Sequence, residues 1–240
     1  SVTRSGQFTA IATFTPDDGD NYAVSSVEET ITVNKKNVTI VFASGNQTTN
    51  VNGNDINNTA SISIGKIGSQ TATIAYTRTA GTNNMATVNS SNGGVTFGSV
   101  AGSVTIQAKV SDDDVYYTSS AITYDITINK LPTSISFDDT SLGSMTYGET
   151  LDIAATEDSS IAGTVSYSIS TEDDNTADAS VTGSVVSVTQ SGQFTAIATF
   201  TPDASDTYDE SPPIKKTITV NKKNVTIAFA SGNQTTVVDG

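Results

Sequence analysis

Short runs in which hydrophobic and polar residues alternate recur along the chain. Each run follows a glycine (Gly6, Gly102 or Gly192) and precedes an acid-rich loop that ends near a tyrosine. An apolar residue at every second position is typical of a strand with one buried face. The apolar positions of the three runs are Phe8, Ala10, Ala12 and Phe14; Val104, Ile106, Ala108 and Val110; and Phe194, Ala196, Ala198 and Phe200.

A second strand follows each acid-rich loop and carries the related letters ITVNK, ITINK and ITVNK. Other short apolar runs are separated by Gly, Asn, Asp and Ser clusters, which favour turns. No segment has a helical period with caps. The pattern predicts an all-β fold of tandem immunoglobulin-like β-sandwiches. In the first complete unit the expected strands lie at 38–42, 60–64, 72–77, 95–97, 104–110 and 122–128, and in the second at 134–137, 150–155, 164–169, 184–188, 194–200 and 216–220.

Two stretches of the sequence are repeated almost letter for letter. Residues 1–16 match residues 187–202 except that Arg4 is replaced by Gln190. Residues 30–49 match residues 217–236 except that Val41 is replaced by Ala228. A diverged repeat with about half the spacing of these two blocks lies inside the long repeat, because the ITxNK runs end at Lys35, Lys130 and Lys222. This shorter spacing is about the size of one sandwich.

These repeats predict four segments. Residues 1–34 are the C-terminal part of an immunoglobulin-like domain, 35–130 and 131–222 are complete domains, and 223–240 carry the first strand of another. Neither terminal segment can close a core alone, so we expect the natural protein to continue in both directions. The junctions VNKKNVTI and INKLPTSI leave almost no linker, and Pro132 stiffens the second. We therefore expect the domains to lie end-to-end as an extended rod.

Composition narrows the chemistry. The 240 residues include no Cys and no His, so thiol nucleophiles, Ser-His-Asp triads, disulfides and structural zinc sites are excluded. The net charge of −14 would repel nucleic acid and anionic lipid, and no apolar run is long enough to cross a membrane. Paired carboxylates could hydrolyse glycosides. A spacer needs a unit that is copied along the chain, whereas an enzyme needs only one active site. We therefore expect that the chain is not an enzyme.

The charge is unevenly divided between the two complete domains. Residues 35–130 contain 6 basic and 5 acidic residues and are near-neutral, whereas residues 131–222 contain 3 basic and 14 acidic residues. We expect the acidic domain to keep the protein soluble by repulsion, and the near-neutral domain to be the better candidate for lateral contact.

Three motifs of residues 131–222 appear together in a known repeat class. They are TYGET (Thr146 to Thr150), ATFTPD…Y (Ala198 to Tyr208) and TITVNK (Thr217 to Lys222). In this order they resemble the MBG-type bacterial immunoglobulin-like repeats of giant secreted surface adhesins, including gliding-motility adhesins. Residues 1–34 resemble a truncated copy. Residues 35–130 lack TYGET and have VSDD in place of FTPD. The resemblance implies an extracellular stalk and identifies no ligand.

The acid-rich loops are candidate calcium sites, because hard cations prefer several converging oxygen ligands. No loop has the EF-hand spacing, and the junctions carry Lys35, Lys36, Lys222 and Lys223, so clamps of the cadherin type are disfavoured. Solvated turn residues are the default interpretation of these loops, with calcium in at least one of them as the alternative, and no other cofactor is expected. The candidate calcium ligands are Asp17, Asp18, Asp20, Asp112, Asp113, Asp114, Asp203 and Asp206, with Asp209 beside them and a further acidic cluster at 172–178.

Two further sets of aromatic residues carry structural predictions. The tyrosines of the acidic loops, Tyr22, Tyr117 and Tyr208, are expected to pack against the sandwich edge and to bond the backbone through their hydroxyls. The expected core anchors are Phe14, Phe42, Phe97, Phe137, Phe194 and Phe200.

These observations indicate a structural stalk segment of a long extracellular bacterial adhesin or surface filament, which holds or pulls on a distal adhesive region. Its main partners would be further copies of the repeat in one long chain, with surface glycans or other surface proteins as additional candidates. Two alternatives remain open. One is a calcium- or glycan-binding module, and the other is a filament subunit that assembles laterally.

Overall fold

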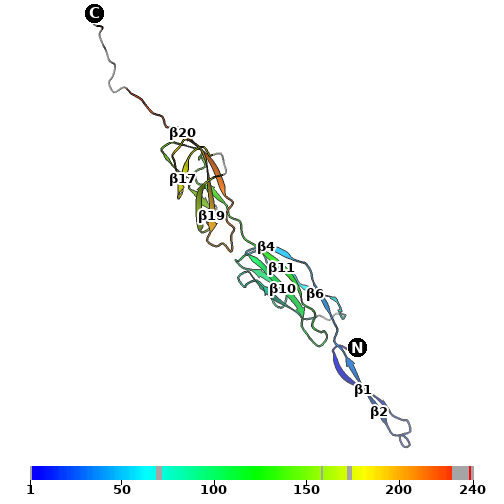
Figure 1. Ribbon diagram of the computed structural model, residues 1–240. Coiled ribbons are helices and arrows are strands. Elements are labelled where there is room, and N and C mark those ends of the chain that lie inside the picture. Colours follow the sequence, from blue (N-terminus) through cyan, green and yellow to red (C-terminus); the bar gives the residue numbers. More distant parts are fainter. Residues whose placement is uncertain (1, 69–71, 158, 172–174, 229–237, 239–240) are drawn as a thin grey trace. The chain divides into compact units, whose positions relative to one another are not determined.

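The computed structural model describes residues 2–68, 72–157, 159–171, 175–228 and 238, and it contains strands, turns and irregular segments but no helix among them (Figure 1). The all-β prediction is confirmed. The chain is made of tandem β-sandwich domains and divides into two compact units, Ser1–Leu131 and Pro132–Gly240. Each unit is described by itself below.

The first unit contains the β1–β2 hairpin followed by the first sandwich, β3 to β11. The strands are β1 (Gly6–Phe14), β2 (Ser25–Val33), β3 (Thr39–Phe42), β4 (Gln47–Asn50), β5 (Ile56–Asn57), β6 (Ala60–Ile64), β7 (Ile74–Ala80), β8 (Ala86–Val88), β9 (Gly94–Phe97), β10 (Gly102–Val110) and β11 (Ile122–Asn129).

The second unit contains the second sandwich, β12 to β20. Its strands are β12 (Ile135–Phe137), β13 (Ser144–Thr146), β14 (Thr150–Asp152), β15 (Ala155–Glu157), β16 (Gly163–Ile169), β17 (Ala179–Thr182), β18 (Val185–Val188), β19 (Gly192–Pro202) and β20 (Ile214–Asn221).

The two sandwiches have the same topology although their sequences have diverged. In the first, one sheet has the order β4-β11-β10-β7 and faces the smaller sheets β3-β6 and β5-β9-β8. In the second, the order β13-β20-β19-β16 faces β12-β15 and β14-β18-β17. The last strand of each sandwich pairs parallel with the second strand, β11 with β4 and β20 with β13. The remaining strand pairs within each sandwich are antiparallel.

The cores lie where the alternating pattern places them. Val104, Ile106, Ala108 and Val110 of β10 are fully buried in the first sandwich, and Val104 and Ile106 cluster there with Tyr124, Ile126 and Ile128 of β11. Phe194, Ala196, Ala198 and Phe200 of β19 fill the same role in the second. Phe97 is also buried, whereas Phe42 and Phe137 are half-buried against these clusters.

Strand positions predicted from sequence are correct for the long strands and incomplete for the short ones. The predictions omit β4, β5, β8, β13 and β17. These strands have two to four residues, and β4 (QTTN) and β5 (IN) carry too little apolar pattern to be recognised. The expected strand at 150–155 is two strands, β14 and β15, which belong to different sheets. The strand expected at 72–77 begins at Ile74 and runs to Ala80.

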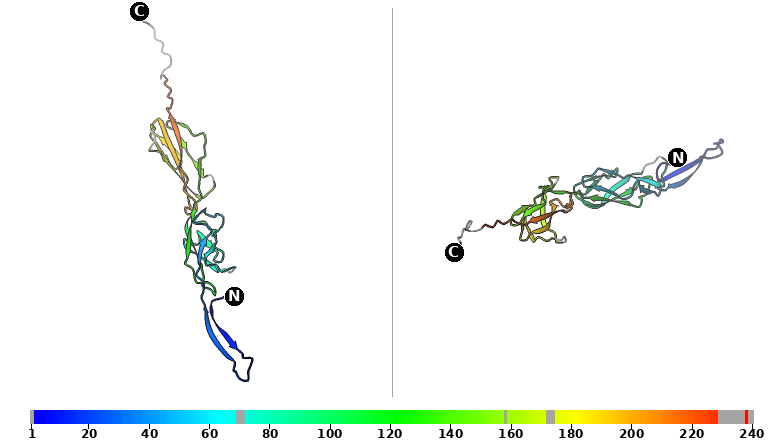
Figure 2. Two further views of the ribbon diagram at one scale, coloured as in Figure 1. Left: turned by 90° about the vertical axis from the view of Figure 1, so that its right-hand side faces the viewer. Right: turned by 90° about the horizontal axis from the view of Figure 1, so that it is seen from above.

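The β1–β2 hairpin forms a two-stranded sheet (Figures 1 and 2, blue ribbon). Its first strand, GQFTAIATF, has the same letters as the start of β19. Phe8 is 44% exposed and Phe14 is 69% exposed, whereas their counterparts Phe194 and Phe200 are 0% and 2% exposed. The prediction that Phe14 is a core anchor is therefore wrong for this chain. Local sequence forms the strand, but burial needs the strands of a facing sheet.

The C-terminal segment also shows that a strand sequence needs partner strands. The sequence NVTI occurs at 37–40 and again at 224–227. The first copy contributes to β3, which pairs with β6, whereas residues 222–228 form no strand and Val225 and Ile227 are exposed. The strand predicted for 223–240 is therefore absent from residues 223–228, and residues 229–237 of that prediction lie outside the described residues.

Candidate functional site: the acidic loop at a strand junction

The chain passes from the hairpin into the first sandwich over a short, fixed segment. β2 ends at Val33 and β3 begins at Thr39. Between them, the Lys36 amide donates to the Val115 carbonyl at 2.8 Å, and the Tyr117 amide donates to the Lys36 carbonyl at 3.0 Å. Lys36 and Tyr116 thereby form a parallel bridge. The linker is held as an extra piece of strand beside the β10–β11 loop, so its backbone cannot rotate freely.

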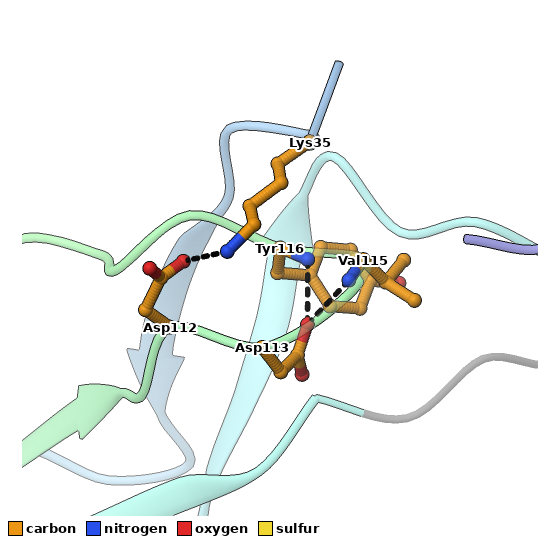
Figure 3. A network of polar contacts seen from close by, with 5 residues as sticks. All are labelled: Lys35, Asp112, Asp113, Val115 and Tyr116. Atoms are coloured by element: carbon orange, nitrogen blue, oxygen red, sulfur yellow. Dashed lines mark hydrogen bonds and ion pairs between the residues drawn. The ribbon is translucent and has the colours of Figure 1, made fainter. Parts of the chain in front are cut away.

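Asp113 gives the loop its shape. One oxygen of its carboxylate, Oδ1, accepts hydrogen bonds from the amides of Val115 and Tyr116, both at 2.7 Å (Figure 3). An aspartate that bonds the amides two and three residues ahead stabilises a turn. The Asp113 amide also donates to the Tyr116 carbonyl at 3.2 Å. Asp113 is therefore committed to the loop's own backbone.

The two neighbouring aspartates reach the hairpin side of the junction. Lys35 Nζ lies 2.8 Å from Asp112 Oδ1, and Figure 3 shows the lysine side chain extended toward that carboxylate. Arg4 Nε lies 3.7 Å from Asp114 Oδ2, and the Ser5 amide donates to the Asp114 carbonyl at 2.7 Å. The loop thus contacts the chain on both sides of the hairpin.

The electrostatics agree with this geometry. The hydrogen bond to Asp112 raises the pKa of Lys35 above its ordinary value, and the charges of Asp112, Asp114 and Asp113 add to the effect. Both partners are at the surface, so the pair orients the loop more than it stabilises the fold. We refer to the contacts of residues 112–117 with Arg4, Ser5, Lys35 and Lys36 as the junction clamp.

The structure corrects the tyrosine prediction by one position. Tyr116 is fully buried, and its hydroxyl accepts a hydrogen bond from the Ile67 amide at 3.2 Å. Tyr117, which the sequence pattern favours, is 45% exposed. Because Asp113 fixes the Tyr116 amide, the ring of Tyr116 enters the core and the next side chain points outward. Tyr22 is also exposed, since no sheet formed by the described residues faces the hairpin, and Tyr208 is half-buried.

The other predicted calcium ligands lie on exposed loops. Asp18 accepts hydrogen bonds from the backbone and side-chain amides of Asn21. Asp17 and Asp20 are exposed, as are Asp203, Asp206 and Asp209. Asp178 accepts a hydrogen bond from Thr189, and 172–174 lie outside the described residues. Among the described residues, no three acidic side chains gather closely enough to hold a metal ion. Calcium binding remains a prediction from sequence.

Two buried hydrogen bonds recur at equivalent places in the sandwiches. The hydroxyl of Ser119 accepts from the Val110 amide, and that of Ser211 accepts from the Phe200 amide, both at 2.9 Å. Each bond closes the loop that follows the long central strand. Likewise, Tyr76 accepts from the Ala60 amide and Tyr167 from the Ala155 amide, both at 2.9 Å. These residues tie one sheet to the other, and no motif drew attention to them.

The sequence of the second unit repeats the hairpin positions that take part in the junction clamp. Gln190, Ser191, Lys222 and Lys223 occupy the repeat positions of Arg4, Ser5, Lys35 and Lys36. They help to line a cavity of about 450 Å³. Because Arg4 is one of only two letters that differ between the near-identical blocks, comparison of the copies could have identified it as a contact residue.

Comparisons with known proteins give likenesses of fold. No family model and no curated protein matches the chain. Human protocadherin-24 EC1-2 is 16% identical, with a TM-score of 0.31, over 77% of this chain and 98% of that chain. Drosophila N-cadherin EC1-3 is 12% identical, with a TM-score of 0.31, over 83% and 74%. A variant of titin I67–I69 is 9% identical, with a TM-score of 0.36, over 93% and 77%. These likenesses say nothing of what the chain binds.

A search of the described residues for a helix long and apolar enough to cross a membrane finds none.

Proposed function

We propose that this chain is a load-bearing segment in the stalk of a long extracellular adhesin or surface filament. The resemblance of its motifs to MBG-type repeats favours a bacterial surface protein that holds or pulls on a distal adhesive region. The observation that carries the proposal is the parallel pairing of β4 with β11 and of β13 with β20.

This pairing suits a protein that is pulled from both ends. In each sandwich the strand near the start of the domain lies parallel to the strand by which the chain leaves. Pulling the two ends apart slides such strands along each other, so their hydrogen bonds resist together. Antiparallel neighbours pulled from the same end would instead separate one bond at a time. A domain that serves as a spacer under tension benefits from the first geometry.

The junction clamp supports the same function. A tether of Gly and Ser would stretch and rotate before passing force to the next element. Residues 34–38 are instead bonded to the β10–β11 loop through Lys36, and Lys35 is anchored to Asp112. Tension that enters the first sandwich through β2 would therefore reach β3 with little slack.

Single-molecule pulling of the whole chain tests this function. We expect two separate unfolding events, one for each sandwich. A matched pair of variants addresses the parallel strands. The Val51 amide donates to the Asn129 carbonyl at 2.9 Å, so alternation along the strand directs the Thr49 amide toward β11 and the Thr48 amide away.

Thr49→Pro removes a backbone donor from this ladder, whereas Thr48→Pro does not. We expect Thr49→Pro to lower the unfolding force of the first sandwich and Thr48→Pro to change it little. Equal forces for the two variants and the parent would contradict a load-bearing role for the parallel pair. Small-angle scattering adds a check on extension. A single compact body of 240 residues has a radius of gyration of about 18 Å, and a stalk should exceed this clearly.

A further inference from the structure

An open cavity lies on the outer face of the first sandwich, where β7 and β10 pair. Its volume is about 370 Å³, within the range of about 300–1,000 Å³ that proteins use to bind small ligands. Residues of both strands line it, with Gln107 paired to Thr77 and Lys109 paired to Ala75. Side chains of paired residues project from the same face of a sheet, so these four stand side by side. We refer to this feature as the β7–β10 cavity.

The loop after β10 forms one wall of the cavity. Asp112 and Thr118 line it on that side. The Asp112 carboxylate already has a partner, because Lys35 Nζ lies 2.8 Å from Asp112 Oδ1 (Figure 3). The neighbouring Asp114 is paired with Arg4 at 3.7 Å. The junction clamp therefore positions this wall and balances the negative charges next to the cavity.

Lys109 supplies the charge that remains. It is exposed, and it forms no ion pair with another of the described residues. Because Lys35 balances Asp112, the ammonium of Lys109 leaves the cavity with a net positive charge. The protein as a whole carries a net charge of −14. The cavity is therefore a local exception that would attract an anion which the rest of the surface repels.

The uncharged groups of the cavity suit a ligand that is rich in hydroxyls. The side-chain amide of Gln107 and the hydroxyls of Thr77 and Thr118 can both donate and accept hydrogen bonds, as the hydroxyls of a sugar can. None of the described residues that line the cavity is aromatic, so a sugar ring would gain no stacking there. A neutral sugar would depend on hydrogen bonds alone, whereas a sugar with a carboxylate would also gain an ion pair.

We propose that the β7–β10 cavity binds an acidic sugar unit, a uronate. Its carboxylate would lie against Lys109, and its hydroxyls would bond to Gln107, Thr77 and Thr118. This site is additional to the load-bearing function proposed above and does not depend on it.

The second sandwich differs at the equivalent face. The buried alanine between Gln107 and Lys109 corresponds to one in β19, because each pairs with the tyrosine that bonds to the facing sheet. Ile197 and Thr199 therefore stand in the places of Gln107 and Lys109. Lys215 also lies beside Ile197, but on β20, away from β16. We therefore expect the second sandwich not to bind a uronate at this face.

The test titrates the whole chain with methyl β-glucuronide and follows the backbone amides by NMR. We expect saturable shifts at Gln107, Lys109 and Thr118, with a dissociation constant of about 1–10 mM, and none at Ile197 or Thr199. Methyl β-glucoside, which has a CH2OH group in place of the carboxylate, should bind about three- to tenfold more weakly. Added salt should weaken binding of the glucuronide and leave the glucoside unchanged.

Variants of the whole chain assign the contacts. Lys109→Gln should weaken glucuronide binding by about three- to tenfold. Lys130→Gln is the matched control, because it removes an equal charge just beyond the far end of β11, and it should change binding by less than about twofold. Thr77→Val keeps the shape of the side chain without its hydroxyl and should weaken both sugars by about two- to fivefold. The double variant Gln107→Ile and Lys109→Thr, which gives β10 the residues of β19, should abolish saturation.

The outcomes separate the sugar site from a general attraction of anions. Equal effects of Lys109→Gln and Lys130→Gln would overturn the site. Equal affinities for the glucuronide and the glucoside would overturn the role of the carboxylate. Acetate is the third probe and should bind more weakly than the glucuronide. Acetate that binds as tightly, together with no effect of Thr77→Val, would overturn the assignment to a sugar.

Discussion

Ser211 accepts a hydrogen bond from the backbone amide of Phe200, and this contact joins the end of the longest strand to the loop that leaves it. Ser119 makes the same contact with Val110 in the first sandwich. Both serines are buried, so each hydroxyl gives a backbone amide inside the sandwich the hydrogen-bond acceptor that water cannot supply there.

Replacing either serine by alanine should leave that amide unpaired. We expect Ser211→Ala and Ser119→Ala each to lower the free energy of unfolding of their own sandwich by about 1–3 kcal/mol. Ser120→Ala, at an exposed neighbour, should change it by less than about 0.5 kcal/mol. Hydrogen exchange read separately in the two sandwiches measures the effect. Equal effects of Ser119→Ala and Ser120→Ala would show that the buried bond is not needed.

The two copies of the FTAIATF strand allow a comparison in which sequence is held constant. Phe200→Ala should destabilise the second sandwich by about 3–5 kcal/mol, because it leaves a cavity in the core. Phe14→Ala removes the same side chain from an exposed strand and should cost less than about 0.5 kcal/mol. Denaturant melts of the two variants check this difference. A loss below 1 kcal/mol for Phe200→Ala would contradict its place in the core.

Tyr76 and Tyr124 should respond in opposite ways to loss of their hydroxyls. Tyr76 accepts from the Ala60 amide, so Tyr76→Phe should cost about 1–3 kcal/mol of unfolding free energy. The buried hydroxyl of Tyr124 has no hydrogen-bond partner among the described residues. Its ring packs edge-on against the ring of Phe42, with 4.7 Å between the ring centroids. Tyr124→Phe should therefore be neutral or stabilising. A clear loss of stability in Tyr124→Phe would reveal a partner.

Tyr124 also predicts a pH dependence. Burial raises the pKa of Tyr124 above its ordinary value of 10.0, and Tyr76 adds to this. A group whose pKa is higher in the folded state contributes stability that is complete below the unfolded value and is lost as pH rises past it. We expect the stability of the first sandwich to fall above pH 10, and to fall less in Tyr124→Phe. Melts between pH 8 and 11 would contradict this if both proteins lost stability equally.

Lys35 and Lys36 provide a test of the junction clamp. The hydrogen bond to Asp112 raises the pKa of Lys35, so its charge persists above the ordinary 10.5, and the contact should fail only as pH rises through the raised value. Lys35→Met should speed exchange at the Lys36 and Tyr117 amides by about two- to fivefold. Lys36→Met should not, because Lys36 acts through its backbone. In an NMR titration of the side-chain carbons, Asp112→Asn should lower the pKa of Lys35 toward its ordinary value.

Alternation along the long strands was enough to predict the sheets that carry the core. Phe194 and Val104 occupy the positions that a period of two assigns them. The short strands were missed because β4 and β13 are recognised through pairing with a distant strand rather than through their own side chains.

The site was predictable only in part. The acidic residues at 112–114 pointed to this loop as a site, but their residue type led to a prediction of metal ligands. The structure assigns Asp113 to a turn and Asp112 to Lys35, which is far from it in sequence. The burial of Tyr116 rather than Tyr117 depends on that turn. Such details follow from backbone geometry, which composition does not encode.

The two sandwiches share a topology but differ in sequence. This difference affects how such a chain folds. Neighbouring domains with the same sequence can exchange strands while they fold and become trapped in misassembled forms. Here the near-identical blocks at 1–16 and 187–202 are separated by a sandwich whose sequence has diverged from them. A newly made hairpin therefore meets an unlike neighbour first. Alternation of two diverged domains would let a long repeat array keep nearly identical copies with few errors in assembly.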